Sequence, residues 1–263
     1  MQITSWNINS LKARRGHVET YLKDPAPDVL MVQELKGLDF SHEDFKALGY
    51  QTAAVTQKAY NGVAIFSKTP ITVIHESLPG DESDVQARYI EFETGGLRLI
   101  NVYCPNGNPV YEDDAVTFHE KYTYKLDWMK RLKTRLAELL DQNIPFAIGG
   151  DFNVIPEAKD CHDSNAWDGD ALFRIETHAI YRAILNLGLT EAFRVLNTHD
   201  EQYTFWDYQA GAWPKNNGIR IDHFLLSPHI ADRLQACTID TAPRGWEKPS
   251  DHTPITLTLT SDE

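Results

Sequence analysis

Short apolar runs bounded by turn residues recur along the whole chain and predict a protein rich in β-strands. The runs are enriched in β-branched and aromatic residues, and Gly, Pro, Asn or Asp stands beside them, as is typical of strands. The expected strands are Gln2–Asn7, Asp28–Gln33, Gly49–Ala54, Gly62–Ser67, Arg88–Glu93, Leu97–Tyr103, Phe146–Gly150, Tyr203–Trp206, Ile219–Leu226, Ala236–Thr241 and Thr253–Thr260.

Helices are predicted where apolar residues recur every three or four positions. The expected helices are His17–Leu22, His42–Leu48, Asp114–Gln142, Ile175–Asn186 and Glu191–Val195. In the longest of them the leucines fit one buried face, and a proline follows its end. We expect its basic residues on the solvent-exposed face; they are Lys121, Lys125, Arg131, Lys133 and Arg135.

The order of these elements indicates an α/β protein that is not a regular parallel barrel. Some strands follow one another directly and others alternate with helices, which predicts sheets with antiparallel pairs and helices outside them. No linker, low-complexity tract or repeat interrupts the 263 residues. We therefore expect a single domain that spans residues 1–263 and buries a large core.

Composition and charge bear on where the protein is located and on whether it binds nucleic acid. The apolar runs are too short for a membrane span, the N-terminus lacks the pattern of a secretion signal, and the three cysteines are sparse. A cytoplasmic protein with reduced thiols is expected. With 25 Lys and Arg against 38 Asp and Glu, the net charge is −13. That charge disfavours tight DNA binding by counterion release, but it leaves room for an acidic pocket neutralised by metal.

Polar residues suited to metal and phosphate chemistry stand at the ends of the expected strands. Asp151 and Asn153 follow the apolar run at residues 145–148, and Asp251-His252 precedes the last strand. With Asn7 and Glu34 they suggest a hard-cation site of oxygen ligands, which suits Mg²⁺. Taken singly, each is equally explained as a turn former or a solvated strand end.

Three further residues, Asp222, Tyr103 and Asn106, are candidates for the site. Asp222 lies inside an apolar run, and a buried carboxylate is costly when unpaired. Arg220, two residues before it, is one candidate partner, and a histidine from another strand is the other. Tyr103 and Asn106 lead from a strand into a Pro/Gly loop, where Tyr103 alone also fits an ordinary amphipathic strand end.

Seven motifs in order along the chain resemble the exonuclease III type of abasic-site endonuclease, within the endonuclease/exonuclease/phosphatase superfamily. Each motif alone is weak, but the ordered set is specific and runs from residue 2 to about residue 259. The motifs are Trp-Asn-Ile-Asn (6–9), Val-Gln-Glu-Leu-Lys (32–36), Asn-Gly-Val-Ala-Ile-Phe-Ser-Lys (61–68), Asn-Val-Tyr-Cys-Pro-Asn-Gly (101–107), Gly-Gly-Asp-Phe-Asn (149–153), Arg-Ile-Asp-His-Phe-Leu-Leu-Ser (220–227) and Lys-Pro-Ser-Asp-His-Thr-Pro (248–254).

The resemblance implies a four-layered α/β sandwich, with two mixed sheets face to face and helices outside, and a Mg²⁺-dependent phosphodiesterase in which Mn²⁺ can substitute. Glu34 would be the main metal ligand, with Asp251 and Asn7 close to the ion. Asp151, held by Asn153, would orient or deprotonate the attacking water and lie near the metal. The number of metal ions and the identity of the formal base stay open.

The resemblance assigns the remaining site residues to the phosphate. His252, paired with Asp222, would contact the scissile phosphate, and Tyr103 and Asn106 would stabilise the oxygens of the pentacovalent state. A metal ion and fixed hydrogen-bond donors are what such a charged transition state needs.

The implied substrate is double-stranded DNA with abasic sites or blocked 3′ ends. The enzyme would be a monomer that cuts 5′ to the abasic site and leaves a 3′-OH, with 3′–5′ exonuclease or 3′-end-cleaning activity. Phe205 and Trp206 would lie at the damaged nucleotide, although a hydrophobic plug over a sheet end also explains them. Lys12, Arg14 and Arg15 would grip neighbouring phosphates.

Alternatives remain at this stage. One is a superfamily phosphodiesterase for RNA or for a lipid or inositol phosphate, and the other is a non-enzymatic binding module. Tyr103-x-Pro-Asn-Gly stands where lipid-cleaving and deoxyribonuclease I-like relatives commonly use histidine, which favours the abasic-site branch. The sequence departs from the family at Ser10, often glycine, at Lys12, often arginine, and at Ile219, aromatic in some relatives.

Overall fold

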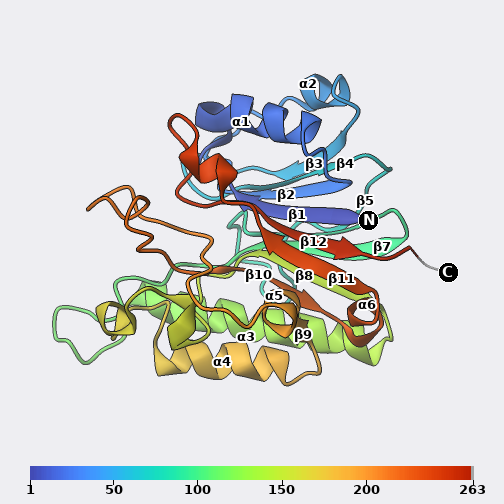
Figure 1. The fold of residues 1–263 in the computed structure, drawn as a ribbon. Coiled ribbons are helices and arrows are strands. Elements are labelled where there is room, and N and C mark those ends of the chain that lie inside the picture. The colour runs from blue at the N-terminus through green and yellow to red at the C-terminus, as the bar shows by residue number, and fades with distance from the viewer. Residues whose placement is uncertain (262–263) are drawn as a thin grey trace.

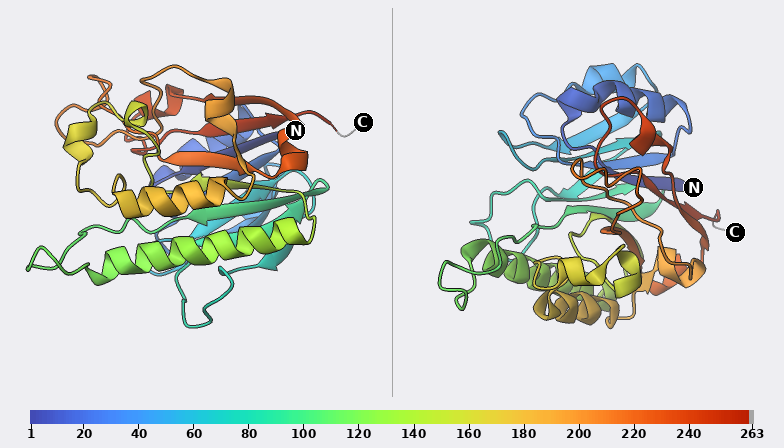
Figure 2. Two further views of the ribbon diagram at one scale, coloured as in Figure 1. Left: turned by 90° about the horizontal axis from the view of Figure 1, so that it is seen from below. Right: turned by 60° about the vertical axis from the view of Figure 1, so that its left-hand side comes forward.

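Two six-stranded sheets form the centre of the structure, and helices cover the outer face of each (Figure 1). The computed structural model describes residues 1–261. The strand orders are β11-β12-β1-β2-β4-β3 and β5-β6-β7-β8-β10-β9. Helices α1 and α2 lie outside the first sheet, and α3 and α4 lie outside the second (Figures 1 and 2). The expected four-layered sandwich of two mixed sheets is confirmed.

The first sheet and its helices come from the two ends of the chain. Their bounds are β1 Gln2–Asn7, α1 Leu11–Lys23, β2 Val29–Gln33, α2 His42–Lys46, β3 Gln51–Val55, β4 Val63–Ser67, β11 Leu234–Ile239 and β12 Ile255–Leu259. The second sheet and its helices are β5 Thr72–His75, β6 Tyr89–Thr94, β7 Leu97–Tyr103, α3 Glu120–Asp141, β8 Phe146–Asp151, α4 Ile175–Leu185, β9 Thr190–Glu191, α5 Ala192–Leu196, β10 Asp222–Leu226 and α6 Pro228–Ala231.

The inner faces of the sheets meet in an apolar core that is crossed by polar contacts of Asn101. Met31 of β2 and Phe224 of β10 belong to the same buried cluster. Within this layer the Gln33 amide donates to Asn101 Oδ1 over 2.7 Å, and Asn101 donates to the carbonyl oxygens of Val32 and Ala64. Because buried amides are costly unless paired, these bonds fix the position of one sheet on the other.

Each sheet contains one parallel pair, and the two pairs place the candidate site. Strands β1 and β2 run parallel in the first sheet, and β7 and β8 run parallel in the second. Parallel strands end at the same edge of a sheet. Asn7 of β1 and Asp151 of β8 therefore approach each other across the sandwich, and the Asn7 amide donates to Asp151 Oδ2 over 3.0 Å.

Several expected elements have different bounds. The segment Tyr203–Trp206 is not a strand but a loop with isolated bridges from Phe205 to Ile219 and to His252. The long helix begins at Glu120 rather than at Asp114, whose carboxylate instead accepts from the backbone of two following residues. The helix expected at His17–Leu22 is longer at both ends. The short elements β5, β9 and α6 were not predicted.

No helix within residues 1–261 is long and apolar enough to cross a membrane.

Ser10 caps α1 from a backbone conformation that favours glycine. Its φ is 95° and its ψ is 108°, and its hydroxyl accepts from Ala13 N over 3.3 Å. A side chain in this region costs on the order of 1–3 kcal/mol, whereas glycine at an N-cap in place of serine loses only a few tenths of a kcal/mol. The departure from glycine therefore stores strain beside the site.

Replacing Ser10 by glycine is expected to stabilise the protein by about 1 kcal/mol, after the extra freedom of glycine in the unfolded chain is subtracted. That corresponds to a rise in Tm of roughly 2–4 °C. Ser41 is the matched control because it precedes α2 with an ordinary φ of −95°. Calorimetry on both variants decides: Ser41→Gly should lower Tm, and a lower Tm for Ser10→Gly would refute the strain.

Candidate active site

A cavity of about 230 Å³ opens at the edge of the sandwich where β1, β2, β7 and β8 end. Its polar lining contains most of the residues that the sequence singled out, and its apolar lining closes one side. The lining residues are Glu34, Tyr103, Asn106, Asn108, Asp151, Asn153, Trp167, Leu172, Phe205, Ile219, Ile221, Asp251 and His252.

Two glycines explain why β8 can deliver Asp151 to this cavity. A side chain at Gly150 would place Cβ 2.0 Å from the carbonyl oxygen of Val102 on β7, and the φ of Gly150 is +149°. At Gly149 the Cβ would lie 2.3 Å from the Phe224 ring. Only glycine allows these close approaches, so the Gly-Gly-Asp sequence sets the end of the strand.

Glu34, Asp151 and His252 form a compact group with metal-ligating potential. Ligand atoms from the three side chains all lie within 4.8 Å of one another. The Asn7 amide joins the two carboxylates because it donates to Glu34 Oε1 over 2.9 Å and to Asp151 Oδ2 over 3.0 Å. Glu34 has a φ of 59°, a strained conformation of the kind found at functional sites.

The two carboxyl groups have opposite pKa shifts. Burial alone would raise the pKa of Glu34, but the Lys36 ammonium, 2.6 Å away, and the Asn7 amide lower it below its usual value. Burial raises the pKa of Asp151 to about 7, even though the charge of His252 opposes this. A cation beside Asp151 would remove that penalty, so the residues present fit a divalent metal.

Asp251 lines the same cavity but lies outside this compact group. Its Oδ1 accepts from the Asn9 amide over 3.0 Å and from the Ser250 hydroxyl over 3.3 Å. The Ser250 hydroxyl also donates to the carbonyl oxygen of Asn7 over 2.7 Å. Glu34 and Asp251 both line the cavity, and Asn7 bonds to Glu34. Asp151 is the carboxylate that groups with Glu34 and His252, and one ion shared by Glu34, Asp251 and Asn7 stays a prediction.

His252 lies between two buried carboxylates. Its Nδ1 is 2.8 Å from Asp222 Oδ2, and its Nε2 is 3.7 Å from Asp151 Oδ2. Burial alone lowers the pKa of His252, but Asp222 and Asp151 outweigh it and raise the pKa to about 10. The imidazole is therefore a cation with one N–H directed by Asp222 and the other on the cavity side.

Of the two partners considered for Asp222, the structure shows the histidine. Arg220 pairs with two other carboxylates, with Nε 2.9 Å from Asp160 Oδ1 and Nη1 3.0 Å from Glu191 Oε1. Asp222 faces Asp151 in the antiparallel register of β10 and β8, which brings its carboxylate toward the cavity.

Amide and hydroxyl groups complete the polar wall. The backbone N–H of Asn153 donates to Asp151 Oδ1 over 2.9 Å, and the Asn106 amide donates to Asn153 Oδ1 over 3.2 Å. The Arg88 guanidinium lies 4.8 Å from the centre of the Tyr103 ring. Burial, together with Glu34 and Asp151, raises the pKa of Tyr103 well above its usual value, so the phenol stays a hydrogen-bond donor.

Only one of the two adjacent aromatic residues reaches the cavity. Phe205 lines it, with its ring centre 5.0 Å from that of His252. Trp206 is 2% exposed, donates from Nε1 to Asn216, and packs against Trp213. Of the two residues expected at the damaged nucleotide, the cavity lining includes Phe205 and not Trp206, because neighbouring side chains in an extended segment point to opposite sides. Their contact with the damaged nucleotide stays a prediction.

The sequence did not assign the rest of the apolar wall to the site. Trp167, Leu172, Ile219 and Ile221 line the cavity beside Phe205. Ile219 and Ile221 alternate along an extended segment, so the period of two placed them on one face. Trp167 ends a 3-10 helix, Ser164–Trp167, and Leu172 lies in a turn after it. The position of this segment depends on tertiary contacts.

The basic residues near α1 are partly committed to other contacts. Lys12 is exposed. Arg14 donates to the carbonyl oxygen of Asn9 and to the Tyr208 hydroxyl. Arg15 lies 2.7 Å from a Glu19 oxygen and 2.9 Å from an Asp44 oxygen. Their role in phosphate binding remains a prediction.

The expectation of a solvated basic face on α3 is wrong for three residues. Lys125 is fully buried, Arg131 pairs with Asp84, and Arg135 pairs with Glu91. This face of α3 packs against the rest of the protein. Its cations are accommodated there because Lys125 donates to backbone carbonyl oxygens and the two arginines pair with carboxylates.

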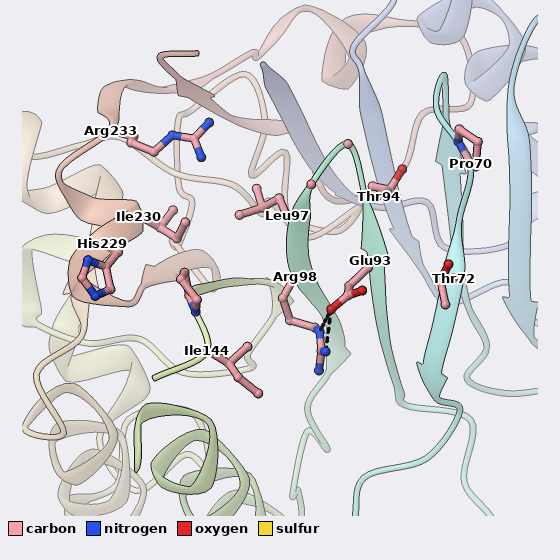
Figure 3. A pocket seen from close by; sticks show the side chains of 13 residues that line it. Pro70, Thr72, Glu93, Thr94, Leu97, Arg98, Ile144, His229, Ile230 and Arg233 are labelled. Carbon is pink, nitrogen blue, oxygen red and sulfur yellow. Dashed lines mark hydrogen bonds and ion pairs between the residues drawn. The ribbon is translucent and has the colours of Figure 1, made fainter. Parts of the chain in front are cut away.

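A larger hollow, about 500 Å³, lies at the opposite edge, where β7 and β8 begin (Figure 3). Arg98 in its lining is held by Glu93 in an ion pair (Figure 3). The residues expected to carry chemistry are absent from its lining within residues 1–261. The chemistry therefore belongs to the smaller cavity.

Comparisons with known proteins show similarity to exodeoxyribonucleases along nearly the whole chain. The chain is 34% identical to exodeoxyribonuclease III of Haemophilus influenzae, over 97% of this chain and 98% of that protein. It is 31% identical to an exodeoxyribonuclease of Bacillus subtilis, over 98% and 99% of the two chains.

Solved structures at more than 30% identity have the same fold, and two of them illustrate the match. The 3′ phosphatase NExo from Neisseria, bound to a product DNA hairpin, superposes with a TM-score of 0.93 at 34% identity, over 99% of this chain and 100% of that chain. An AP endonuclease from Archaeoglobus fulgidus gives 0.91 at 33% identity, over 99% and 100%. The model of the Endonuclease/Exonuclease/phosphatase family matches residues 4–252, and the chain belongs to that family.

Proposed function

We propose that this chain is a Mg²⁺-dependent DNA repair enzyme that cuts duplex DNA 5′ to abasic sites, leaves a 3′-OH, and also removes blocking groups from 3′ ends. Its nearly full-length likeness to exodeoxyribonucleases makes it a phosphodiester hydrolase of the exodeoxyribonuclease III type and a DNA repair nuclease. The observation that carries the finer proposal is His252 held between Asp222 and Asp151 in a small cavity with an apolar wall.

The polar wall supports hydrolysis of a phosphodiester. Glu34 and Asp151, with Asn7 between them, would hold a divalent cation, which supplies positive charge to the phosphate oxygens when bound. The His252 imidazolium donates an N–H to a phosphate oxygen, while Asp222 fixes the orientation of the ring. The buried Asp151 carboxylate accepts a proton from the attacking water, and Asn153 N–H keeps its other oxygen in place.

The opposite wall supports a nucleotide that has no base. A cavity of about 230 Å³, closed by Phe205, Trp167 and Leu172, leaves room for a sugar and phosphate beside the polar groups. An abasic nucleotide leaves the duplex at low cost because no base is unpaired, whereas an intact nucleotide loses a few kcal/mol. The preference for damage then comes from the cavity rather than from charge, in keeping with the net charge of −13.

Cleaning of 3′ ends uses the same cavity. A terminal nucleotide is joined to one neighbouring nucleotide in its strand, whereas an internal nucleotide is joined to two. Its phosphate therefore reaches the polar wall with less distortion of the duplex. The structural likeness to the 3′ phosphatase NExo favours this second activity.

Replacing Phe205 by alanine is expected to reduce the ratio of abasic to intact duplex cleavage by roughly tenfold or more, because the enlarged cavity admits a base. Hydrolysis of a small phosphodiester, bis(4-nitrophenyl) phosphate, should change by less than threefold, since the polar wall is intact. Steady-state rates on duplexes that differ only at one nucleotide give the ratio.

Trp206→Phe provides the control. This side chain packs away from the cavity and bonds to Asn216, so the variant should lose thermal stability and keep the wild-type preference. An unchanged ratio in Phe205→Ala would clear Phe205 of the role. Equal cutting of abasic and intact duplexes by the wild type would refute the cavity argument itself.

A further inference from the structure

Lys125 on α3 is a buried cation without a carboxylate partner among residues 1–261. Its side chain is 0% exposed, and none of the ion pairs within that range includes it. An ammonium group in such a place is costly unless hydrogen bonds replace its water. It donates instead to two carbonyl oxygens, at 3.0 Å to Asn106 O and at 2.6 Å to Asn153 O.

Those two carbonyls belong to different loops of the active site. Asn106 follows β7, and Asn153 follows β8. Their side chains meet on the cavity side, where the Asn106 amide donates to Asn153 Oδ1 over 3.2 Å. The backbone N–H of Asn153 in turn holds Asp151 Oδ1. The Lys125 ammonium is therefore linked to the buried Asp151 carboxylate by hydrogen bonds through Asn153, and Asn106 is bonded to both Lys125 and Asn153.

The loop after β7 is shaped to admit the lysine. A Cβ at Gly107 would lie 2.6 Å from Lys125 Cδ, and Gly107 has a φ of +92°. The stem of Lys125 thus fills the space that a side chain at this position would need. Asn153 has a φ of 48°, a left-handed backbone conformation, and its carbonyl oxygen accepts from the same ammonium.

We propose that Lys125 is a positioning residue for phosphodiester hydrolysis, which ties the Asn106 loop to the Asn153 loop and so sets where Asn106 and Asp151 meet the phosphate. It touches no substrate. This proposal rests on the hydrolytic activity of the polar wall and is independent of whether the preferred DNA is abasic.

Lys125→Met keeps the length of the stem and removes the donor. We expect kcat to fall by roughly 10–100-fold, because small displacements of catalytic groups have effects of that size, and KM to change by less than threefold. Lys125→Arg, which keeps a cationic donor, should recover at least part of the lost kcat. Turnover is measured with Mg²⁺ on an abasic duplex and on the 3′ end of an intact duplex, at a temperature below the Tm of every variant.

Arg135→Met is the matched control because Arg135 is a nearly buried cation of the same helix that pairs with Glu91, away from the cavity. It should lower Tm while kcat stays within twofold of the wild type. In the double variant of Lys125→Met and Asn106→Ala, kcat should fall by less than the product of the two single effects, since both substitutions act through the side-chain amide of Asn106.

The outcomes separate the two proposals. A wild type that is inactive on the abasic duplex but active on the 3′ end refutes the preferred substrate and leaves the Lys125 test intact. A Lys125→Met enzyme with normal kcat, or one whose effect multiplies fully with that of Asn106→Ala, overturns the positioning role. If the methionine variant does not fold, Lys125→Gln with the same measurements decides.

Discussion

Replacing Asp222 by asparagine is expected to lower kcat by roughly 10²–10⁴-fold while KM changes little, the size of effect seen when an oriented catalytic group loses its carboxylate. Asp222 Oδ2 lies 2.8 Å from His252 Nδ1 and helps to keep the imidazole cationic. An asparagine amide neither stabilises that charge nor ensures that the second N–H faces the cavity. Steady-state kinetics with Mg²⁺ on the abasic duplex measure both constants.

Asp160→Asn is the control for this substitution. Asp160 is also fully buried, but it pairs with Arg220 and Arg194 rather than with a group of the cavity. This variant should have a lower Tm and a nearly normal kcat. If Asp222→Asn behaves in the same way, the Asp222–His252 pair is structural and the catalytic role fails.

The same pair gives a pH-dependent stability. The folded pKa of His252, about 10, lies above its ordinary value of 6.5, so its contribution to stability is fully present below pH 6.5 and is lost as the pH rises through 10. The Tm difference between wild type and Asp222→Asn should therefore be larger at pH 6.5 than at pH 10.

Removal of the divalent cation is expected to have the other large effect. Excess chelator, or Glu34→Ala, should lower the rate by roughly 10³-fold or more, because a metal ion at a phosphoryl oxygen contributes several kcal/mol to the transition state. Mg²⁺ or Mn²⁺ at 100 times its Kd should stabilise the wild type by about 2.7 kcal/mol. Rates in chelator and thermal scans with and without metal are the measurements.

Protons should compete with the metal. Because burial raises the pKa of Asp151 to about 7, calorimetric titration with Mn²⁺ should give a weaker affinity at pH 6 than at pH 8. Glu157→Ala, which removes an exposed carboxylate outside the cavity, should leave metal affinity unchanged. Full activity in chelator, or for Glu34→Ala, would contradict the metal site.

Much of the fold could be predicted because the periodicity of apolar residues and the residues that end a strand are local properties of the sequence. The apolar runs that became β1, β2, β7 and β8 alternate or are continuous. β7 and β8 end at Tyr103 and Asp151 of the cavity, Glu34 of the cavity follows β2, and β1 ends at Asn7, which bonds to Glu34 and Asp151. Short edge elements such as β5 carry few buried residues, so their local signal is weak. Expectations of a single domain, a monomer and a cytoplasmic location stay predictions.

The site was predicted less evenly, because side-chain direction depends on distant parts of the chain. Phe205 and Trp206 are adjacent, and only tertiary contacts decide which faces the cavity. The burial of Lys125 could have been predicted from its position. It lies three residues after Tyr122 and four before Met129, both buried, and therefore on the apolar face of α3. Charge alone suggested the opposite.

The most direct test of the account is incision of an end-labelled duplex that contains one abasic site. With Mg²⁺ the wild type should produce a single cut on the 5′ side that leaves a 3′-OH. The undamaged duplex should stay intact internally, and excess chelator should abolish the cut. Incision that persists in chelator, or equal cutting of the undamaged duplex, would contradict a metal-dependent site that selects a base-less nucleotide.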